Sequence, residues 1–164
     1  MRAILGIDPG LVNTGWAIIN SESNKLQYIA SGTIKTNSKD DISQRLSEIY
    51  NAVLGIIKTH NPLEMAIEDS FVNNNPMSSL KLGQARAASI LAAGNNEMKV
   101  FEYAPRFVKK AVVGSGKADK NQIIAMVKYL MPSVTVSTDH EADALAVAIC
   151  HSNISSTMQR MNIT

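Results

Sequence analysis

A short apolar run near the start of the chain ends in a single acidic residue. Residues 3–7 (AILGI) are followed by Asp8 and then by Pro9 and Gly10, which predict a turn. A second apolar run begins at Trp16, at hairpin distance. A charge inside a buried strand is costly, whereas a charge at the strand's end is fixed by the sheet and accessible to a ligand. The pattern therefore predicts a strand that presents Asp8 at a binding site.

The remaining hydrophobic periodicity predicts an α/β protein. Strands are expected at 12–20, 26–36, 65–67 and 100–103, and helices at 40–60, 78–95, from 105, at 119–131 and from 139 to about 152. A long helix between two strands is typical of parallel pairing. The acid Glu68 ends the strand after that helix, so Asp8 and Glu68 are predicted at the carboxyl ends of neighbouring strands, where open α/β sheets place their sites.

The chain length favours a single domain over residues 1–152. The Asn-rich stretch 71–77 contains a proline and is predicted as a loop. Residues 153–164 form a polar tail that we expect to be frayed.

A third acid lies at the start of the last predicted helix. His140 and Asp143 are three residues apart and therefore share a helix face, and the apolar residues that follow predict an almost wholly buried helix. A buried carboxylate needs a partner, and a metal ion would supply one. Taken singly, each acid would more often be a helix cap or a surface ion-pair partner, and Asp139 with Asp143 is a competing pair. Together the acids predict a metal-dependent phosphoryl-transfer domain.

The composition places few limits on function. Hydrophobic residues make up 45% of the chain and charged residues 18%, as in ordinary globular proteins. The net charge of +2 permits an anionic partner without requiring one. No apolar run approaches the roughly 18 residues that span a bilayer, and no secretory leader is recognisable, so no membrane partner and a cytoplasmic location are expected. The single Cys150 excludes an internal disulfide and is expected to be buried.

An ordered set of motifs is similar to the RuvC family of bacterial Holliday-junction resolvases. The motifs, spread from Arg2 to about His151, are GIDPG with Thr14-Gly15, AIEDSF, LKLGQARAA, VFEYAPRFVKKAVVGSGKADK and HEADALAVA. The resemblance implies an RNase H-like fold, a five-stranded mixed sheet flanked by helices. It also implies a homodimeric, Mg²⁺-dependent endonuclease that nicks two opposed strands of a four-way DNA junction and contacts a branch-migration motor.

The same resemblance assigns the candidate catalytic residues. The family's acids match Asp8, Glu68 and Asp143, and His140 occupies the remaining position, where some members carry Asp. The implied mechanism is two-metal-ion phosphodiester hydrolysis, with two Mg²⁺ per site or Mn²⁺ as a substitute, which leaves 5′-phosphate and 3′-hydroxyl ends. Asp8 is expected to bridge both ions.

The resemblance also assigns residues to DNA. Lys109 and Lys120 match lysines near the scissile phosphate, and Phe71 matches an aromatic residue that enters the junction. The neighbouring basic residues expected to follow the DNA backbone are Arg106, Lys110 and Lys117. The small-residue helix at 78–95 matches the family's dimer element, and packing within the chain is the alternative use of such a small-residue face.

Three other functions remain in competition. An actin-like ATPase would need a second domain, and the stretch ending at Lys117 is not a phosphate-binding loop, because Ala111 and Ala118 stand where that motif needs Gly and Ser or Thr. An RNase H-like nuclease acting on another nucleic acid and a catalytically silent junction-binding module stay open as alternatives.

Overall fold

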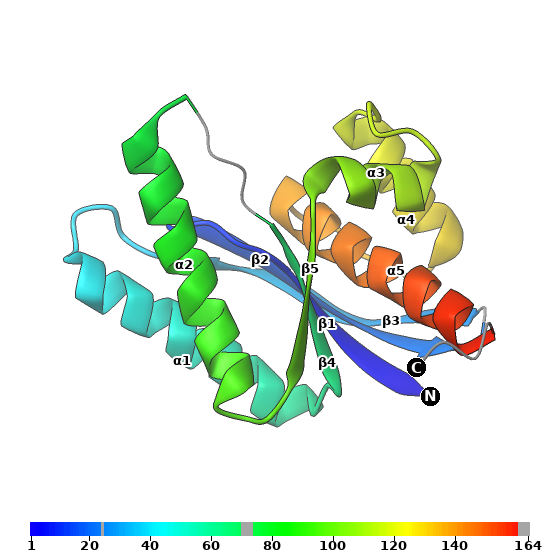
Figure 1. Ribbon diagram of the computed structural model, residues 1–164, viewed down its shortest axis with the longest axis horizontal. Coiled ribbons are helices and arrows are strands. Elements are labelled where there is room, and N and C mark those ends of the chain that lie inside the picture. Colours follow the sequence, from blue (N-terminus) through cyan, green and yellow to red (C-terminus); the bar gives the residue numbers. More distant parts are fainter. Residues whose placement is uncertain (24, 70–73, 161–164) are drawn as a thin grey trace.

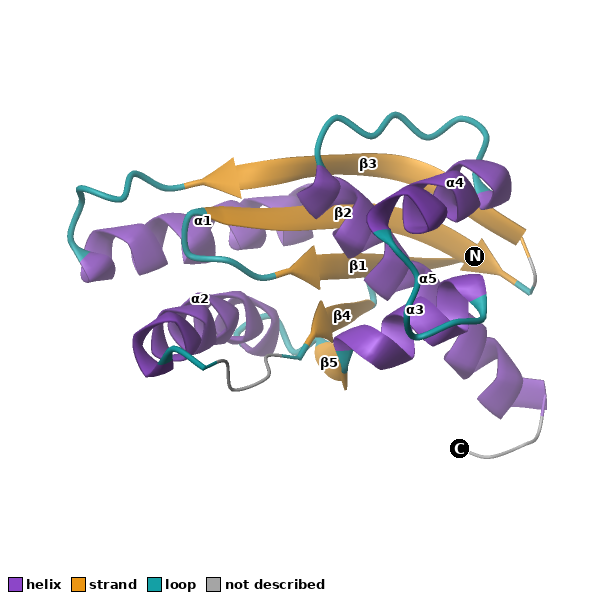
Figure 2. Ribbon diagram, turned by 90° about the horizontal axis from the view of Figure 1, so that it is seen from above, coloured by secondary structure: helices purple, strands orange, loops and turns teal. Residues whose placement is uncertain are grey.

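The protein is built on a mixed β-sheet with helices on both faces (Figures 1 and 2). The structure is a computed structural model and describes residues 1–23, 25–69 and 74–160. The five strands lie in the order β3-β2-β1-β4-β5. Their bounds are β1 Arg2–Asp8, β2 Asn13–Glu22, β3 Lys25–Lys35, β4 Glu64–Glu68 and β5 Lys99–Tyr103. The predicted five-stranded mixed sheet is confirmed.

Strand direction changes in the middle of the sheet. β1 pairs antiparallel with β2, which pairs antiparallel with β3, whereas β1 pairs parallel with β4 and β4 with β5. In the parallel register Ile7 lies beside Ile67. The next residues, Asp8 and Glu68, therefore leave the sheet side by side at its carboxyl edge.

The helices form two layers. Their bounds are α1 Ile42–His60, α2 Pro76–Gly94, α3 Pro105–Val113, α4 Lys120–Leu130 and α5 Asp139–Arg160. Figure 1 shows α1 and α2 on one face of the sheet, and α3, α4 and α5 on the other. Each layer encloses its own hydrophobic core.

The alternation of strand residues decides which core each side chain enters. In β1, Leu5 and Ile7 pack toward α1 and α2, whereas Ile4 packs toward α5. Position 8 has the same parity as position 4, so Asp8 faces α5. In β4, Ala66 packs toward α5, and Glu68 follows it on the same face.

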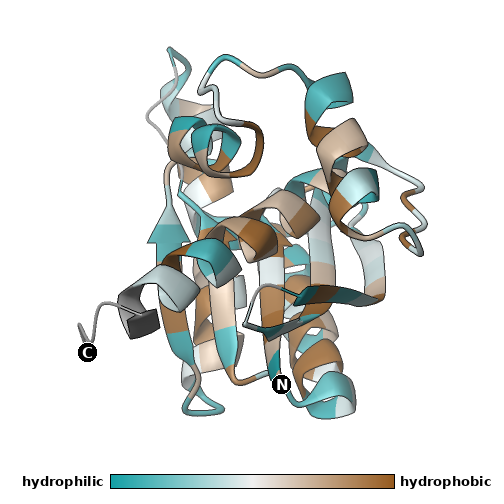
Figure 3. Cartoon of the chain, turned by 90° about the vertical axis from the view of Figure 1, so that its right-hand side faces the viewer, coloured by the Kyte–Doolittle hydropathy of each residue, from teal (hydrophilic) through white to brown (hydrophobic). Residues whose placement is uncertain are grey.

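Helix α5 is the most deeply buried helix of the described chain. Its residues from Ala144 to Cys150 are almost wholly buried against the sheet, and Figure 3 shows apolar residues gathered along its inner part and along the strands. Cys150 is fully buried, as predicted. Two glycines allow this close packing, because a Cβ at Gly6 would overlap the Ala144 carbonyl oxygen and one at Gly15 would overlap the His140 carbonyl oxygen.

Several helix ends differ from the predictions by one or two residues, and two boundaries have causes outside the local sequence pattern. Helix α2 begins at Pro76, inside the predicted loop, because Pro suits the first helical position and the Asn75 side chain accepts hydrogen bonds from the backbone N–H groups of Met77 and Ser78. The predicted end of the last helix near Ser152 is also wrong, since α5 continues to Arg160.

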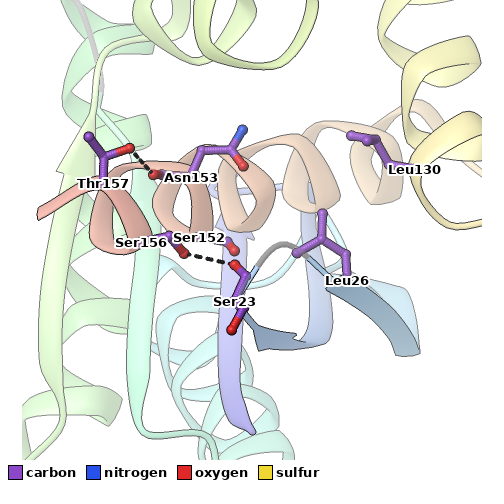
Figure 4. Close-up of a pocket in the computed structure, with 7 residues that line it drawn as sticks. All are labelled: Ser23, Leu26, Leu130, Ser152, Asn153, Ser156 and Thr157. Carbon is purple, nitrogen blue, oxygen red and sulfur yellow. Dashed lines mark hydrogen bonds between the residues drawn. The ribbon is translucent and has the colours of Figure 1, made fainter. Parts of the chain in front are cut away.

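Side-chain hydroxyls stabilise the C-terminal part of α5. Ser152 hydrogen-bonds to Ser21 on β2 at 2.7 Å. Ser156 donates to the carbonyl oxygen of Ser23 (Figure 4). A cavity of about 370 Å³ adjoins these contacts. Its lining residues are Ser23, Leu26, Leu130, Ser152, Asn153, Ser156 and Thr157. The cavity lies at the opposite end of α5 from His140 and is therefore separate from the acids at the sheet edge.

Within the described ranges, no helix has the length and apolar character needed to cross a bilayer.

Candidate active site

Asp8 and Glu68 form the centre of the candidate site. They end the neighbouring parallel strands β1 and β4, and their side chains share a hydrogen bond. The Asp8 side chain is only 13% exposed. The strand-end arrangement predicted from the sequence is thus present in the structure.

Burial and mutual repulsion change the protonation of this pair. Burial, followed by the charge of Asp143, raises the pKa of Asp8 to about 7. Burial, followed by the charges of Asp8 and Asp143, raises the pKa of Glu68 to about 8. Two close carboxylates cannot both ionise without cost, so the pair retains a proton near neutral pH. A cation placed between them would displace that proton.

The first turn of α5 places His140 against Asp8 and brings the charge of Asp143 within electrostatic reach of both acids. His140 Nδ1 lies 3.1 Å from Asp8 Oδ2. Asp143 is close enough for its charge to act on both Asp8 and Glu68. Burial raises the pKa of Asp143, while the nearby Lys120, His140 and Lys109 charges oppose that rise.

Residues around the start of α5 hold this turn against the sheet. Thr138 Oγ1 accepts a hydrogen bond from the Glu141 backbone N–H and so caps the helix. The buried Glu141 carboxylate accepts hydrogen bonds from Ser31 on β3 and from the Ser137 backbone N–H, at 3.0 and 3.2 Å. Asp139, the alternative partner for Asp143, instead pairs with Lys120 at 3.0 Å.

The donor set fits a divalent cation. Carboxylate oxygens are the ligands that Mg²⁺ and Mn²⁺ prefer, and a neutral imidazole is a common additional ligand. The buried Asp8–Glu68 pair carries the excess negative potential that such an ion would neutralise. Over residues 1–23, 25–69 and 74–160, no three His, Cys, Asp or Glu side chains lie close enough to surround one ion. The structure therefore shows pairs of candidate ligands, not a closed metal cage.

Comparison with known proteins identifies the family. A family model described as "Crossover junction endodeoxyribonuclease RuvC" matches residues 4–151. The chain belongs to the RuvC family. Membership of this nuclease family implies the use of a divalent metal ion, in agreement with the donor set of the site.

Curated RuvC proteins are similar to nearly the whole chain. A crossover junction endodeoxyribonuclease RuvC from Chelativorans sp. is 47% identical over 150 residues, which cover 92% of this chain and 88% of that protein. A RuvC from Paramagnetospirillum magneticum is 44% identical over 158 residues, which cover 96% and 95% of the two chains.

Solved structures agree with this assignment. Thermus thermophilus RuvC in complex with a Holliday junction substrate superposes with a TM-score of 0.90 at 27% identity, covering 99% of this chain and 98% of that one. Another T. thermophilus RuvC structure gives 0.86 at 28% identity, with the same coverage. The yeast mitochondrial Holliday junction resolvase Ydc2, at 12% identity and a TM-score of 0.69, shares the fold.

The basic residues predicted to contact DNA lie on α3, α4 and the loop between them, on the same face of the sheet as α5. Lys120, at the start of α4, pairs with Asp139, and its charge acts on Asp8 and Asp143. Lys109, on α3, acts on Glu68 and Asp143. Three further cations are exposed on this side, namely Arg106, Lys110 and Lys117. Phe71 lies outside the described residues.

The structure adds one residue that the sequence did not single out. Arg86, on α2, donates from Nε to the main-chain oxygen of Glu68 at 3.3 Å. It lies within the motif LKLGQARAA, in the small-residue helix predicted at 78–95. An arginine amid such residues was the only available signal, and its partner could not be read from the sequence.

Proposed function

We propose that this RuvC-family protein resolves four-way DNA junctions by nicking opposed strands in a metal-dependent hydrolysis. The observation that carries the proposal is that Asp8 and Glu68 meet the first turn of α5, with the charges of Lys109 and Lys120 close enough to act on these acids. Buried acids that share a proton are poised to exchange it for a divalent ion. The products would carry 5′-phosphate and 3′-hydroxyl ends, and the reaction would serve recombination and DNA repair.

Each candidate ligand has a distinct position. Asp8 contacts both Glu68 and His140, so its carboxylate is the one that could be shared if two ions were bound. Glu68 would then serve one ion, and His140 with Asp143 the other. The chemistry supplied by bound Mg²⁺, or by Mn²⁺ in its place, is a lowered pKa of water and stabilisation of the departing 3′ oxygen.

The surrounding cations position the DNA strand. Lys109 and Lys120 have charges within reach of the acids, so a phosphate at the site would meet both. Neutralising phosphates gives sequence-independent affinity that falls with salt. We assign Arg106, Lys110 and Lys117 to the flanking backbone, and Phe71 to stacking on an unpaired base at the junction centre. Phe71→Ala should then bind intact junctions but fail to cut them.

A second copy of the chain is the proposed protein partner. An apolar hollow of about 390 Å³ lies between α1 and α2. Its lining residues are Leu46, Ser47, Tyr50, Gln84, Ala87, Ala88 and Leu91. Leu80 and Leu91 of α2 are both 57% exposed, and a two-fold dimer suits two symmetric cuts. Sedimentation should give a dimer at micromolar concentration, and a strict monomer would contradict this proposal.

The branch-migration motor as a further partner and the cytoplasmic location are proposed from the family alone.

The decisive experiment is cleavage of a synthetic four-way junction with labelled ends. The protein should make paired, symmetric nicks with Mg²⁺ and none in EDTA, and the nicks should be sealed by ligase. Asp8→Asn should abolish nicking while junction binding in a gel-shift assay stays intact. Cleavage by the pure mutant protein would overturn the site assignment.

Two comparisons test the alternatives. Preferential cleavage of an RNA–DNA hybrid of equal length would indicate a different RNase H-like nuclease. Tight junction binding without any nick in Mg²⁺ or Mn²⁺ would indicate a silent binding module.

A further inference from the structure

Arg86 contacts the ends of two strands at the candidate active site. From α2, its Nε donates to the Glu68 carbonyl oxygen at 3.3 Å. Its Nη2 lies 2.8 Å from Glu102 Oε1 on β5 and 3.5 Å from Asp69 Oδ1. The Arg86 side chain is only 16% exposed. One guanidinium group thus holds the last residue of β4, the residue after it and the neighbouring strand.

The contact with Glu68 acts on the main chain. The Asp69 backbone N–H donates to the Tyr103 carbonyl oxygen at 2.8 Å, so the peptide between Glu68 and Asp69 is held at its nitrogen by β5 and at its oxygen by Arg86. That peptide plane sets the direction in which β4 ends. It therefore influences the direction of the Glu68 side chain, which points to the opposite face of the sheet, toward α5.

The ion pairs of Arg86 with Asp69 and Glu102 do not by themselves offset the cost of burying its charge. Glu102 and Asp69 are 51% and 46% exposed, and ion pairs with such exposed carboxylates contribute little to stability. What is specific is that the planar guanidinium group donates one hydrogen bond from Nε to the Glu68 carbonyl oxygen while Nη2 lies at ion-pair distance from Glu102. A lysine has a single nitrogen and cannot make both contacts.

We propose that Arg86 is a positioning residue for Glu68 and that it couples helix α2 to the active site. This inference rests on the proposed function. Arg86 does not contact the reacting atoms, and its effect passes through the Glu68 backbone. Its neighbours Ala87 and Ala88 line the apolar hollow between α1 and α2. A displacement of α2 at that surface would therefore be transmitted through Arg86 to Glu68.

The test compares Arg86→Lys and Arg86→Ala with two controls. Lys81→Ala removes an exposed charge from the same helix, and Ile57→Val slightly destabilises the core beneath it. Loss of a residue that orients a metal ligand typically costs about 10–100-fold in metal affinity or activity. For both Arg86 variants we expect the Mg²⁺ concentration for half-maximal nicking to rise about 10-fold, while junction affinity and dimer formation stay within about two-fold of wild type. Glu102→Gln should shift the Mg²⁺ dependence in the same direction by less.

A second measurement does not depend on catalysis. Mn²⁺ binding to the free protein, followed by electron paramagnetic resonance, should weaken in the Arg86 variants and stay unchanged in Lys81→Ala and Ile57→Val. Arg86 variants with wild-type Mg²⁺ dependence and Mn²⁺ binding would overturn the inference. So would a loss of activity that merely follows thermal stability, as in Ile57→Val.

If Arg86→Ala does not fold, Arg86→Lys and Glu102→Gln decide the question. If wild-type protein does not cut junctions, the proposed function fails separately. The Mn²⁺ measurement then still decides the role of Arg86, with weaker binding in its variants as support and unchanged binding as refutation.

Discussion

The Cα of Gly15 lies directly against the carbonyl oxygen of His140, with no room for a Cβ between them. Gly15 pairs with Asp8 across β1 and β2. The same glycine therefore lies beside the central carboxylate and under the first turn of α5. This close approach is what brings His140 Nδ1 to 3.1 Å from Asp8 Oδ2.

A larger residue at position 15 should move the start of α5, with His140, away from Asp8 on β1. Gly15→Ala should displace the start of α5, lower the free energy of unfolding by about 1–3 kcal/mol as expected for overpacking, and strongly reduce nicking. Gly55→Ala is the matched control, because its Cβ would meet no neighbour and alanine is the better helix former by up to about 1 kcal/mol. Urea denaturation and junction cleavage measure both effects. A Gly15→Ala protein with wild-type stability and rate would contradict the role of this contact.

The acids should make the metal-free protein less stable as pH rises. Asp8 and Glu68 have folded-state pKa values of about 7 and about 8, above their ordinary 3.8 and 4.5. The folded state therefore binds more protons than the unfolded state in this window. Their contribution is fully present below pH 4 and is lost as pH rises toward 8. Asp8→Asn should raise stability at pH 8 by on the order of 2 kcal/mol and change little at pH 4. Urea midpoints in EDTA test this, and an equal effect at both pH values would contradict it.

Divalent metal should reverse this pH dependence. Metal binds the deprotonated acids, so protons compete with it, and a ligand that binds only the folded state stabilises that state. Adding Mg²⁺ in excess over the protein should raise the melting temperature more at pH 8 than at pH 6, and EDTA should abolish the gain. Asp8→Asn should show little gain at either pH. A rise of equal size in wild type and Asp8→Asn would indicate metal binding elsewhere.

Replacing His140 with an acid should tighten metal binding. His140→Asp adds a negative charge next to the Asp8 carboxylate. The Mg²⁺ concentration for half-maximal nicking should fall by several-fold, and the metal-free protein should become less stable through added repulsion. His140→Gln keeps the size without the charge and is the control. If His140→Asp needs more Mg²⁺ than wild type, His140 does not occupy a ligand position.

The two lysines nearest the acids should matter more for cutting than other surface lysines. Lys120→Ala and Lys109→Ala should each depress the nicking rate by at least about 10-fold, because a preorganised charge beside the reacting phosphate is lost. Lys58→Ala, on α1 on the other side of the sheet, should change the rate less than about two-fold. Equal small effects at all three positions, measured in single-turnover reactions, would indicate an ordinary solvated surface.

Two of the helix boundaries that differ from the predictions, the start of α2 and the end of α5, are explained by contacts in the structure. A proline such as Pro76 is found both in loops and at the first position of a helix. Here the Asn75 side chain caps the helix, so α2 begins at Pro76. The polar residues after Ser152 have no helical periodicity of their own, yet they form the last turns of α5. Ser152 hydrogen-bonds to Ser21, and Ser156 donates to the carbonyl oxygen of Ser23. Both outcomes depend on neighbours that local patterning does not reveal.

The sequence by itself determined the succession of strands and helices along the chain, the acids that end β1 and β4, and the helix face shared by His140 and Asp143. These features follow from the spacing of apolar residues in strands and helices. Only the tertiary structure decided that Gly6 and Gly15 admit α5 to the sheet, that Glu141 turns to Ser31, and that Arg86 holds the Glu68 carbonyl. These contacts join residues far apart in the chain, and their geometry depends on how closely two packed layers approach.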